Sequence, residues 1–423
     1  MKTAWTATTV LPDRLASQSA NQGPDVSEND YVIEVVDSPL AIARMQWNEL
    51  LALQAAATPF MRHEYLCAMH ESDSATAQTG WTPRFVTLRL GTERTGALQG
   101  VCALYLKDHS YGEYVFDHAW AHAYRQHGVP YYPKALVAPP FTPVPGSRLL
   151  ARDDQSRRAL VQGLIRWCEQ SGLSSLHLLF ASDDDVATCR AANMMLRHNV
   201  QFHWTNRAPE PYRDFDDFLS SLNHEKRKKI RQEQRKVEQA GVTFRSARGR
   251  DIDTSDWDFF YRCYERTYYE HGNAPYLSRD FFHRMARDMP DNWLLFIGEL
   301  AGRPIASSLI ALSDAGPQAD QGLIAYGRYW GALERVDCLH FDACYYQPLQ
   351  WCIAHGYRRF EGGAQGEHKM ARALLPVQTT STHWLAHPAF AQAVDDFLQR
   401  ERNGIRNYLG ELESHSPFKR AEP

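Results

Sequence analysis

Residues 351–361 carry the sequence WCIAHGYRRFE, which reads as a helix end followed by a strand, and this stretch has a counterpart earlier in the chain. Residues 167–180, WCEQSGLSSLHLLF, share the Trp-Cys-x-x-x-Gly pattern and also lead into an apolar run. Glycine just past a helix is a common C-terminal signal, because it adopts the left-handed conformation without strain. The shared pattern predicts that one α/β unit occurs twice in the chain.

Two further landmarks repeat in the same order. Pro59 and Pro275 each stand with an aromatic residue just before a helix-like pattern, as helix starts favour. After each of them, two apolar runs flank a turn that contains glycine, which predicts a β-hairpin. The predicted strands of these hairpins are residues 85–90, 101–106, 293–297 and 305–312. We therefore predict helix, hairpin, strand, helix and strand in each unit.

The repeat and the composition together predict four segments. They are a disordered leader at 1–30, an N-terminal domain at 31–208, a C-terminal domain at 209–390, and a helix and tail at 391–423. Pro209 and Pro211 mark the linker between the domains. The leader is rich in Thr, Ser and Asn and lacks the apolar run between basic residues that a signal peptide needs.

The composition, net charge and cysteine pattern exclude several classes of function and location. The chain of 423 residues has 44% hydrophobic and 23% charged residues, which is ordinary for a globular protein. Its net charge of −4 means that any anion binding must be local. No run approaches the roughly 18 apolar residues of a membrane helix, so no membrane insertion is expected. Eight scattered cysteines without a C-x-x-C pair favour a cytoplasmic location. Cys338, His340 and Cys344 lack a fourth ligand, so no metal site is predicted.

The segment after the second repeated strand combines glycines with reactive side chains. Residues 361–369 read EGGAQGEHK. Glycine allows tight turns and close approach of a ligand to the backbone. Glutamate, histidine and lysine are side chains that transfer protons and stabilise anions. We therefore predict a site at this strand end.

Three other segments are candidates for ligand binding. Residues 222–240 form a predicted helix with a concentrated cationic face, which would suit phosphates or would simply be solvated. Residues 326–331, YGRYWG, read as a strand in which Arg328 stands among aromatic residues and is suited to a carboxylate or phosphate. Residues 107–114, KDHSYGEY, combine a turn with several donors and acceptors. We expect this last segment to form a pocket wall rather than a serine triad, since triads assemble in space and not in sequence.

Residues 107–116, 131–144, 326–331, 339–347 and 361–384 resemble the FemAB-like family of predicted N-acyltransferases, often labelled peptidoglycan biosynthesis/recognition. The likeness covers about residues 31–418. It implies an α/β fold of two tandem acetyltransferase-type (GNAT) units with mixed sheets. More distantly, the chain is similar to Fem transferases, which move an aminoacyl group from aminoacyl-tRNA onto a cell-wall precursor amine. Lys369 falls where they carry a lysine followed by an aromatic-Gly motif, and Ala373 stands where close relatives would have Gly.

The coenzyme A signature of ordinary GNAT enzymes is degraded here. Their Q/R-x-x-G-x-G/A loop holds the pyrophosphate between a strand and the next helix. Residues 328–333, RYWGAL, end in Leu, and residues 359–364, RFEGGA, follow the helix instead of preceding it. The pattern favours a donor other than acyl-CoA without excluding it.

The resemblance and the residues together predict an N-acyltransferase. Lys369 would stabilise the oxyanion or a donor phosphate, Glu367 or Glu361 would accept the amine proton, and His368 is an alternative base. The predicted catalytic residues are Lys369, Glu367, His368 and Glu361. The predicted substrate-binding residues are Arg328, Tyr326, Arg372, Gln365, Lys226, Arg227, Lys229, Tyr111, Glu113 and Asp108.

The sequence leaves alternatives for the acyl donor, for the acceptor and for the function. No tightly bound cofactor is expected, and the donor would be aminoacyl-tRNA or acyl-CoA. The acceptor would be an amine of a cell-wall precursor peptide or of a small molecule. An acyl-CoA-dependent acetyltransferase and a non-catalytic module for peptidoglycan or nucleic acid are the alternative functions. Because Glu-His-Lys occurs only in the second unit, the chemistry is expected there, and the first unit is expected to shape the acceptor pocket.

Overall fold

The structure is a computed structural model, and it describes residues 31–91, 96–314, 322–364 and 366–419. Two compact units are present. Unit 1 comprises Met1–Arg197 and Thr380–Leu398, and unit 2 comprises His198–Thr379 and Gln399–Pro423. The predicted division at residues 208 and 209 therefore differs from the observed one, which falls inside a strand and assigns a C-terminal segment to unit 1.

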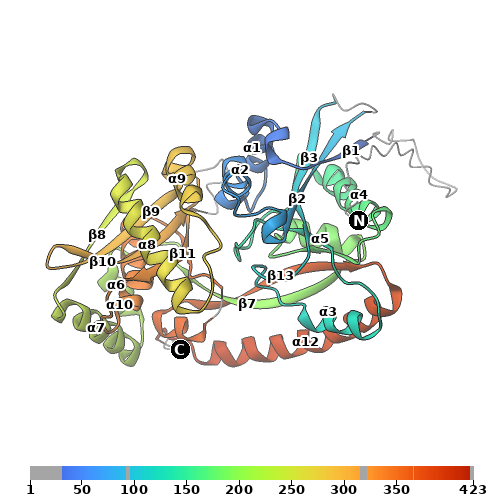
Figure 1. Ribbon diagram of the computed structural model, residues 1–423. Coiled ribbons are helices and arrows are strands. Elements are labelled where there is room, and N and C mark those ends of the chain that lie inside the picture. Colours follow the sequence, from blue (N-terminus) through green and yellow to red (C-terminus); the bar gives the residue numbers. More distant parts are fainter. Residues whose placement is uncertain (1–30, 92–95, 315–321, 365, 420–423) are drawn as a thin grey trace. The chain divides into compact units, whose positions relative to one another are not determined.

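Unit 1 is a mixed sheet with helices on both faces (Figure 1). Its elements are β1 (Tyr31–Val36), α1 (Arg44–Ala52), α2 (His63–Glu71), β2 (Trp81–Leu90), β3 (Leu98–Lys107), α3 (His118–Gln126), β4 (Lys134–Val137), β5 (Leu150–Ala151), α4 (Asp154–Gln170), β6 (Ser175–Leu178) and α5 (Asp183–Ala191). Side chains alternate between the faces of β2: Phe85 contacts Trp47 of α1, whereas Val86 packs in the core cluster that contains α4.

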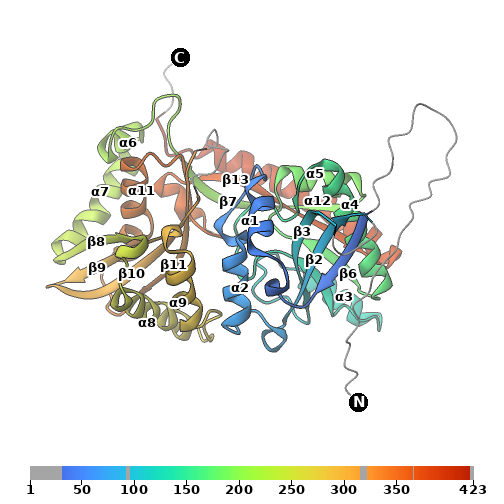
Figure 2. The same cartoon turned by 90° about the horizontal axis from the view of Figure 1, so that it is seen from above.

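Unit 2 repeats this plan (Figure 2). Its elements are β7 (Met195–Thr205, of which unit 2 holds the part from His198), α6 (Phe215–Ser221), α7 (His224–Gln239), β8 (Val242–Arg248), α8 (Thr254–Glu270), α9 (Arg279–Asp288), β9 (Trp293–Leu300), β10 (Arg303–Leu312), β11 (Ile324–Ala332), α10 (Leu339–Phe341), a π-helix (Asp342–Tyr346), α11 (Gln347–Ala354), β12 (Arg359–Glu361) and the 3₁₀ helix η8 (Glu367–Arg372). Trp293 packs on α8, while Phe296 belongs to the core cluster on the opposite face.

Strand pairing confirms the predicted duplication. In unit 1, β1, β2, β3 and β4 pair antiparallel in sequence order, and β4 pairs parallel with β6. In unit 2, β8, β9, β10 and β11 do the same, and β11 pairs parallel with β12. Gly172 and Gly356, the two helix-end glycines, have φ of +65° and +70°, as the helix-stop signal requires.

The last strand of each unit comes from an unexpected part of the sequence. Strand β13 (Leu375–Leu385) follows β12 in the chain, yet its residues Thr382–Leu385 pair antiparallel with β6 of unit 1. Residues His203–Thr205 of β7, which follow β6 in the chain, pair instead with β12 of unit 2. The two units thus exchange their final strands. Helix α12 (Pro388–Ser414) follows β13 and has residues in both units.

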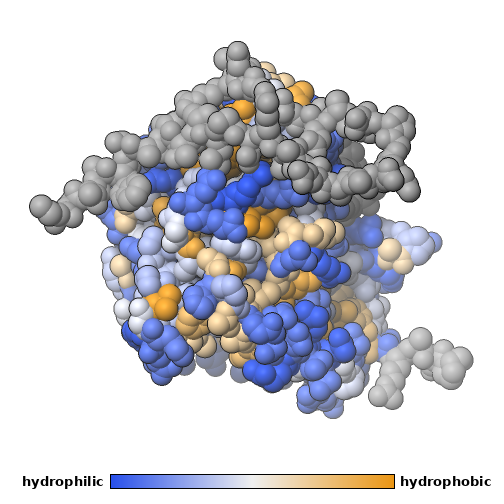
Figure 3. Space-filling view, turned by 90° about the vertical axis from the view of Figure 1, so that its right-hand side faces the viewer, coloured by the Kyte–Doolittle hydropathy of each residue, from blue (hydrophilic) through white to orange (hydrophobic). Residues whose placement is uncertain are grey.

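The surface shows hydrophilic and hydrophobic residues interspersed on the face drawn in Figure 3, with hydrophilic residues in the majority. Scattered apolar residues of this kind are normal on a protein surface. Across the part of the chain that the structure describes, no helix is both long enough and apolar enough to cross a membrane.

Candidate functional site

The candidate site lies in unit 2, where the parallel pair β11–β12 ends. The pairing runs as far as Tyr326 opposite Glu361. Beyond this point β11 contains a β-bulge: Leu309 of β10 is opposite Tyr329, and the next residue, Ile310, is opposite Gly327, so that Arg328 is the extra residue. A bulge bends the strand and interrupts its pairing. Arg328 is therefore set out of the β10–β11 ladder close to where the β11–β12 pairing ends.

Lys369 is held beside this strand end by η8. Its side chain is buried, and its Nζ donates to the carbonyl oxygens of Gly363 at 3.1 Å and Ala364 at 3.3 Å. A Cβ on Gly362 would lie 3.4 Å from Lys369 Cδ, so the lysine stem passes against the glycine that follows β12. Burial lowers the pKa of Lys369 to about 8. A buried ammonium with two carbonyl partners keeps one donor for a further group.

The end of η8 has a backbone conformation that favours glycine. Ala373 follows η8 with φ of +63°, a left-handed conformation in which alanine is strained and glycine is not. This chain tolerates alanine there while Ala373 packs in the core cluster of unit 2.

Glu361, the last residue of β12, is the second titratable group of the strand end. Its Oε1 lies 3.0 Å from Arg359 Nε and 3.9 Å from His203 Nδ1 of β7, and its buried Oε2 has no hydrogen-bond partner. Burial raises the pKa of Glu361 to about 7, although Arg359 acts in the opposite direction. Burial, with help from Arg359 and Lys369, lowers the pKa of His203 to about 3. At neutral pH, Glu361 is therefore divided between its protonated and ionised forms, whereas His203 is neutral.

The two predicted binding residues of β11 flank this carboxyl. Tyr326 is fully buried, and its pKa is raised by burial and further by Glu361. Arg328, at the bulge, donates from Nη2 to the hydroxyl of Tyr329 at 3.1 Å, and its guanidinium lies 5.0 Å from that ring centre. Tyr326 is thus paired with Glu361 in the ladder, Lys369 packs against the next residue, Gly362, and Arg328 lies at the bulge.

Glu367 and His368 lie on a different side of η8. Both are exposed. Glu367 accepts a hydrogen bond of 2.5 Å from the hydroxyl of Tyr408, and His368 Nε2 lies 3.3 Å from the hydroxyl of Tyr345. Burial, with Lys369 and Arg372, lowers the pKa of His368. Glu367 lines a cavity of about 430 Å³ whose other lining residues are Lys226, Met370, Ala371, Tyr408, Glu411, Leu412 and His415. Among the described residues, no ion pair joins Glu367 to Lys369.

Arg372 has a structural environment that differs from its predicted role. Its Nη2 donates to both carboxylate oxygens of Glu233 on α7, at 2.8 and 2.9 Å, and its Nη1 donates to the carbonyl of His368 at 2.8 Å. The guanidinium also lies 3.6 Å from the ring centre of Phe341. A buried guanidinium with these partners fastens η8 to α7, so ligand binding by Arg372 is not supported.

The predicted basic helix is present as α7, with Asn223 as its N-cap. Ile230 and Val237 are buried, which leaves a cationic face toward solvent. Its exposed basic residues are Lys228, Lys229, Arg231, Arg235 and Lys236, and Lys226 and Arg227 are half-buried. Gln365 lies outside the described residues. Within those residues, no three His, Cys, Asp or Glu side chains are grouped to hold a metal.

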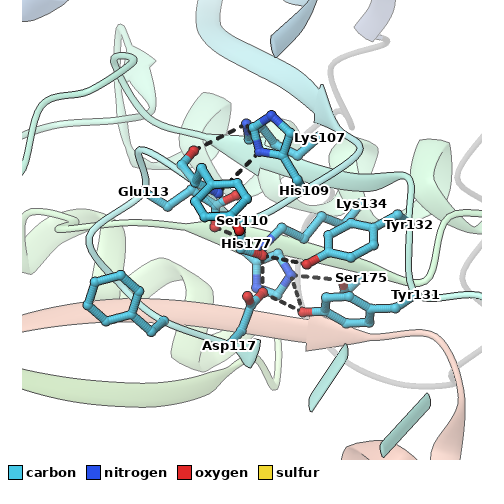
Figure 4. Close-up of polar contacts among 12 residues, drawn as sticks. Lys107, His109, Ser110, Glu113, Asp117, Tyr131, Tyr132, Lys134, Ser175 and His177 are labelled. Atoms are coloured by element: carbon cyan, nitrogen blue, oxygen red, sulfur yellow. Dashed lines mark hydrogen bonds and ion pairs between the residues drawn. The ribbon is translucent and has the colours of Figure 1, made fainter. Parts of the chain in front are cut away.

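Unit 1 contains a buried polar cluster that the sequence reasoning largely missed (Figure 4). Lys134 of β4 is completely buried, and its Nζ donates to Glu113 at 2.8 Å, to Ser110 at 2.9 Å and to Asp117. Tyr131 donates to Asp117 at 2.6 Å. Of the predicted residues, Glu113 is buried in this cluster, whereas Tyr111 and Asp108 are exposed.

The cluster continues into the core of unit 1 through two histidines. His177 Nε2 lies 2.7 Å from Ser175 Oγ, and its Nδ1 lies 2.7 Å from Nδ1 of His383 on β13. Burial lowers the pKa of His177 to about 3. One signal for the cluster was present in the sequence: Lys107 and Lys134 each border an apolar strand, where a lysine needs a partner.

Comparisons with known proteins agree with this architecture. Residues 38–420 match a family described as FemAB-like, peptidoglycan biosynthesis/recognition. No curated protein matches the chain. Among solved structures, FemX is similar with a TM-score of 0.50 and 11% identity, over 84% of this chain and 98% of that one.

Two further structures are similar at lower scores. L-PGS from Bacillus licheniformis has a TM-score of 0.48 and 9% identity, over 84% of this chain and 97% of that one. A tandem GNAT protein from the clavulanic acid biosynthesis pathway has a TM-score of 0.41 and 13% identity, over 84% and 99% of the two chains. The predicted fold class, two GNAT-like α/β units, is confirmed. The chain therefore has the fold of FemX and belongs to the FemAB-like family, which is described as peptidoglycan biosynthesis/recognition.

Proposed function

We propose that this protein is an N-acyltransferase that moves an aminoacyl or acyl group onto an amine acceptor, with aminoacyl-tRNA as donor. Two buried titratable groups carry the proposal: Glu361, the last residue of β12, and Lys369 of η8, whose stem passes against Gly362. Glu361 has a pKa of about 7, and Lys369 has a pKa of about 8. Burial brings both groups near neutrality, where one accepts a proton while the other still carries one.

The two groups suit the two halves of acyl transfer to an amine. The acceptor must attack the donor carbonyl carbon as a neutral amine, and the tetrahedral oxyanion must be stabilised. In this proposal the ammonium of Lys369 donates to the oxyanion. Glu361 takes the proton that the amine nitrogen loses as the C–N bond forms. The carbonyl then re-forms as the C–O bond to the tRNA ribose breaks, and the ribose oxygen takes up the proton that Glu361 accepted.

Glu367 receives a separate role, because it lies away from Lys369. Its cavity carries two carboxylates, Glu367 and Glu411, against the single ammonium of Lys226. An excess of carboxylate favours a cationic group. We assign this cavity to holding an acceptor that carries an ammonium group, such as a cell-wall precursor peptide or a small-molecule amine.

Two observations favour tRNA over acyl-CoA as donor. Gly331 belongs to strand β11, and a Cβ there would lie 1.9 Å from the carbonyl oxygen of Cys263 in α8. This glycine therefore serves helix packing rather than pyrophosphate binding. The connection from β11 to α10, residues 333–338, contains no glycine. By contrast, α7 presents a row of exposed cations in the same unit, which suits a polyanionic donor.

The decisive experiment compares donors directly. Purified protein is incubated with a pool of amines and either radiolabelled aminoacyl-tRNA or labelled acetyl-CoA, and transferred label is identified by mass spectrometry. The expected result is product from aminoacyl-tRNA and a loss of about 10²–10³-fold in turnover for Lys369→Met. Lys419→Met, which removes an exposed lysine, serves as the matched control.

Each alternative predicts a different outcome. Product from acetyl-CoA alone would replace tRNA by coenzyme A as the donor. Binding of tRNA or muropeptide without product from any donor would favour a non-catalytic module. Full turnover by Lys369→Met would remove the central role of this residue.

A further inference from the structure

Unit 1 contains two buried lysines, Lys107 and Lys134, of which Lys134 has the more complete set of polar partners. Lys134 uses its ammonium fully, on Ser110, Glu113 and Asp117. Lys107 is equally buried, but within the described residues its Nζ contacts only the carbonyl of Tyr111 and Nδ1 of His109, both at 3.5 Å, and the ring of Trp81 at 4.0 Å. Among the described residues no carboxylate forms an ion pair with it. Burial accordingly lowers the pKa of Lys107 to about 7.

Glu113 is the complementary half of this imbalance. Its Oε2 accepts from Lys134, but its Oε1 is buried without a hydrogen-bond partner. Burial raises the pKa of Glu113 to about 7, although Lys134 acts in the opposite direction. A buried acceptor that is left unsatisfied costs free energy. Glu113 is therefore bound less favourably in the fold than a carboxylate with both oxygens paired would be.

The segment that carries Glu113 combines the buried Val115 with two exposed aromatic side chains. Tyr111 and Phe116, on either side of it, are 66% and 53% exposed, so these aromatic side chains do not anchor the segment in the core. Gly112 and Tyr114 have φ of +80° and +63°, and the left-handed conformation is strained for tyrosine. When Glu113 moves into solvent, its pKa returns to the ordinary value of a glutamate. The free energy gained from this ionisation offsets the loss of the ion pair with Lys134.

We propose that Lys107 and Lys134 form a carboxylate-binding site in which Glu113 is a built-in substitute for the ligand. A ligand carboxylate takes the place of Glu113 on Lys134 and gives Lys107 a counter-ion. The site suits a planar carboxylate, because the group that fills it now is one. A small carboxylic acid or the free carboxylate of a peptide is the ligand class. This site is in unit 1 and is independent of the chemistry assigned to Lys369.

The test uses sodium acetate as probe on the full chain. The melting temperature is followed against acetate concentration at constant ionic strength, with sodium chloride and inorganic phosphate as parallel arms. A tethered group competes at an effective concentration in the millimolar range or above. Glu113→Ala should therefore respond at acetate concentrations at least about tenfold lower than the wild type. Glu113→Ala/Lys107→Met should lose the response. Glu169→Ala, at an exposed glutamate of the same unit, should behave as wild type.

Two further measurements keep the test decisive if Glu113→Ala does not fold. Glu113→Gln keeps the side-chain volume and should also respond to less acetate than the wild type. In the wild type, acetate should accelerate hydrogen exchange of a peptide covering residues 108–117, as displacement of Glu113 requires. The proposal is overturned if neither variant gains an acetate response, if phosphate stabilises as well as acetate, if Lys107→Met leaves the response intact, or if exchange slows.

Discussion

Replacement of Glu361 by glutamine should stabilise the protein at alkaline pH while it lowers the rate of transfer. The carboxyl has an ordinary pKa of 4.5 and a pKa of about 7 in the fold. The folded state therefore favours the protonated form, which glutamine mimics in shape and charge. Below pH 4.5 the carboxyl is protonated in both states and costs nothing. Between pH 4.5 and 7 the cost of ionising it in the fold grows, and above pH 7 the cost is constant.

The size of the effect follows from the pKa difference. At about 1.36 kcal/mol per unit, the cost is on the order of 3 kcal/mol at pH 8 and about 1.4 kcal/mol at pH 5.5. Glutamine also loses the ion pair with Arg359, but that side chain is 40% exposed, so the loss is about 0–1 kcal/mol. Glu361→Gln should therefore gain about 2 kcal/mol more at pH 8 than at pH 5.5.

The assay is urea unfolding of the wild type and Glu361→Gln at both pH values, beside the transfer assay at pH 8. Glu169→Gln, at an exposed glutamate, is the matched control and should change neither quantity. Loss of the proton acceptor should lower turnover by about 10²–10⁴-fold. Opposite changes in stability and activity are typical of a group kept for function. If the variant is destabilised at pH 8, or equally stabilised at both pH values, the conclusion that burial raises the pKa of Glu361 is wrong.

Three other outcomes are expected. The transfer rate should depend on pH as a bell-shaped curve, because the carboxyl of Glu361, with a pKa of about 7, must be ionised and the amine of Lys369, with a pKa of about 8, must be protonated. About 60% of molecules then have both groups in the required state at pH 7.5, and about 10% at pH 6 or 9. A rate that is constant from pH 6 to 9 would contradict this assignment. Arg372→Met should lower the free energy of unfolding by about 3–5 kcal/mol, because the buried Glu233 loses its guanidinium partner and keeps the hydrogen bond from the Tyr346 hydroxyl. Arg372→Met/Glu233→Leu should recover part of this loss in urea unfolding. Lys228→Ser and Lys229→Ser should each reduce the slope of log K against log salt for tRNA binding by about 0.7–0.9, whereas unchanged slopes would exclude α7 from the tRNA surface.

Local signals in the sequence were sufficient for the repeated elements. The helix-stop glycines Gly172 and Gly356, the apolar hairpins and the N-cap Asn223 all act within a few residues, so their meaning does not depend on distant parts of the chain. The two-unit fold and the helical state of α7 were accordingly predicted. The run at 361–369 was also recognised as a strand end, because glycine and polar residues follow directly on an apolar strand.

Only the tertiary structure decided which partners these elements have. The exchange of β7 and β13 depends on backbone hydrogen bonds between residues far apart in sequence, which no local pattern encodes. The same holds for Glu233, which engages Arg372 from another helix. Burial, a property of the whole fold, sets the pKa of Glu361 near neutrality and leaves Glu367 exposed, although both are glutamates of one short segment. The sequence by itself determined where reactive side chains gather, and the tertiary structure decided which of them are desolvated enough to react.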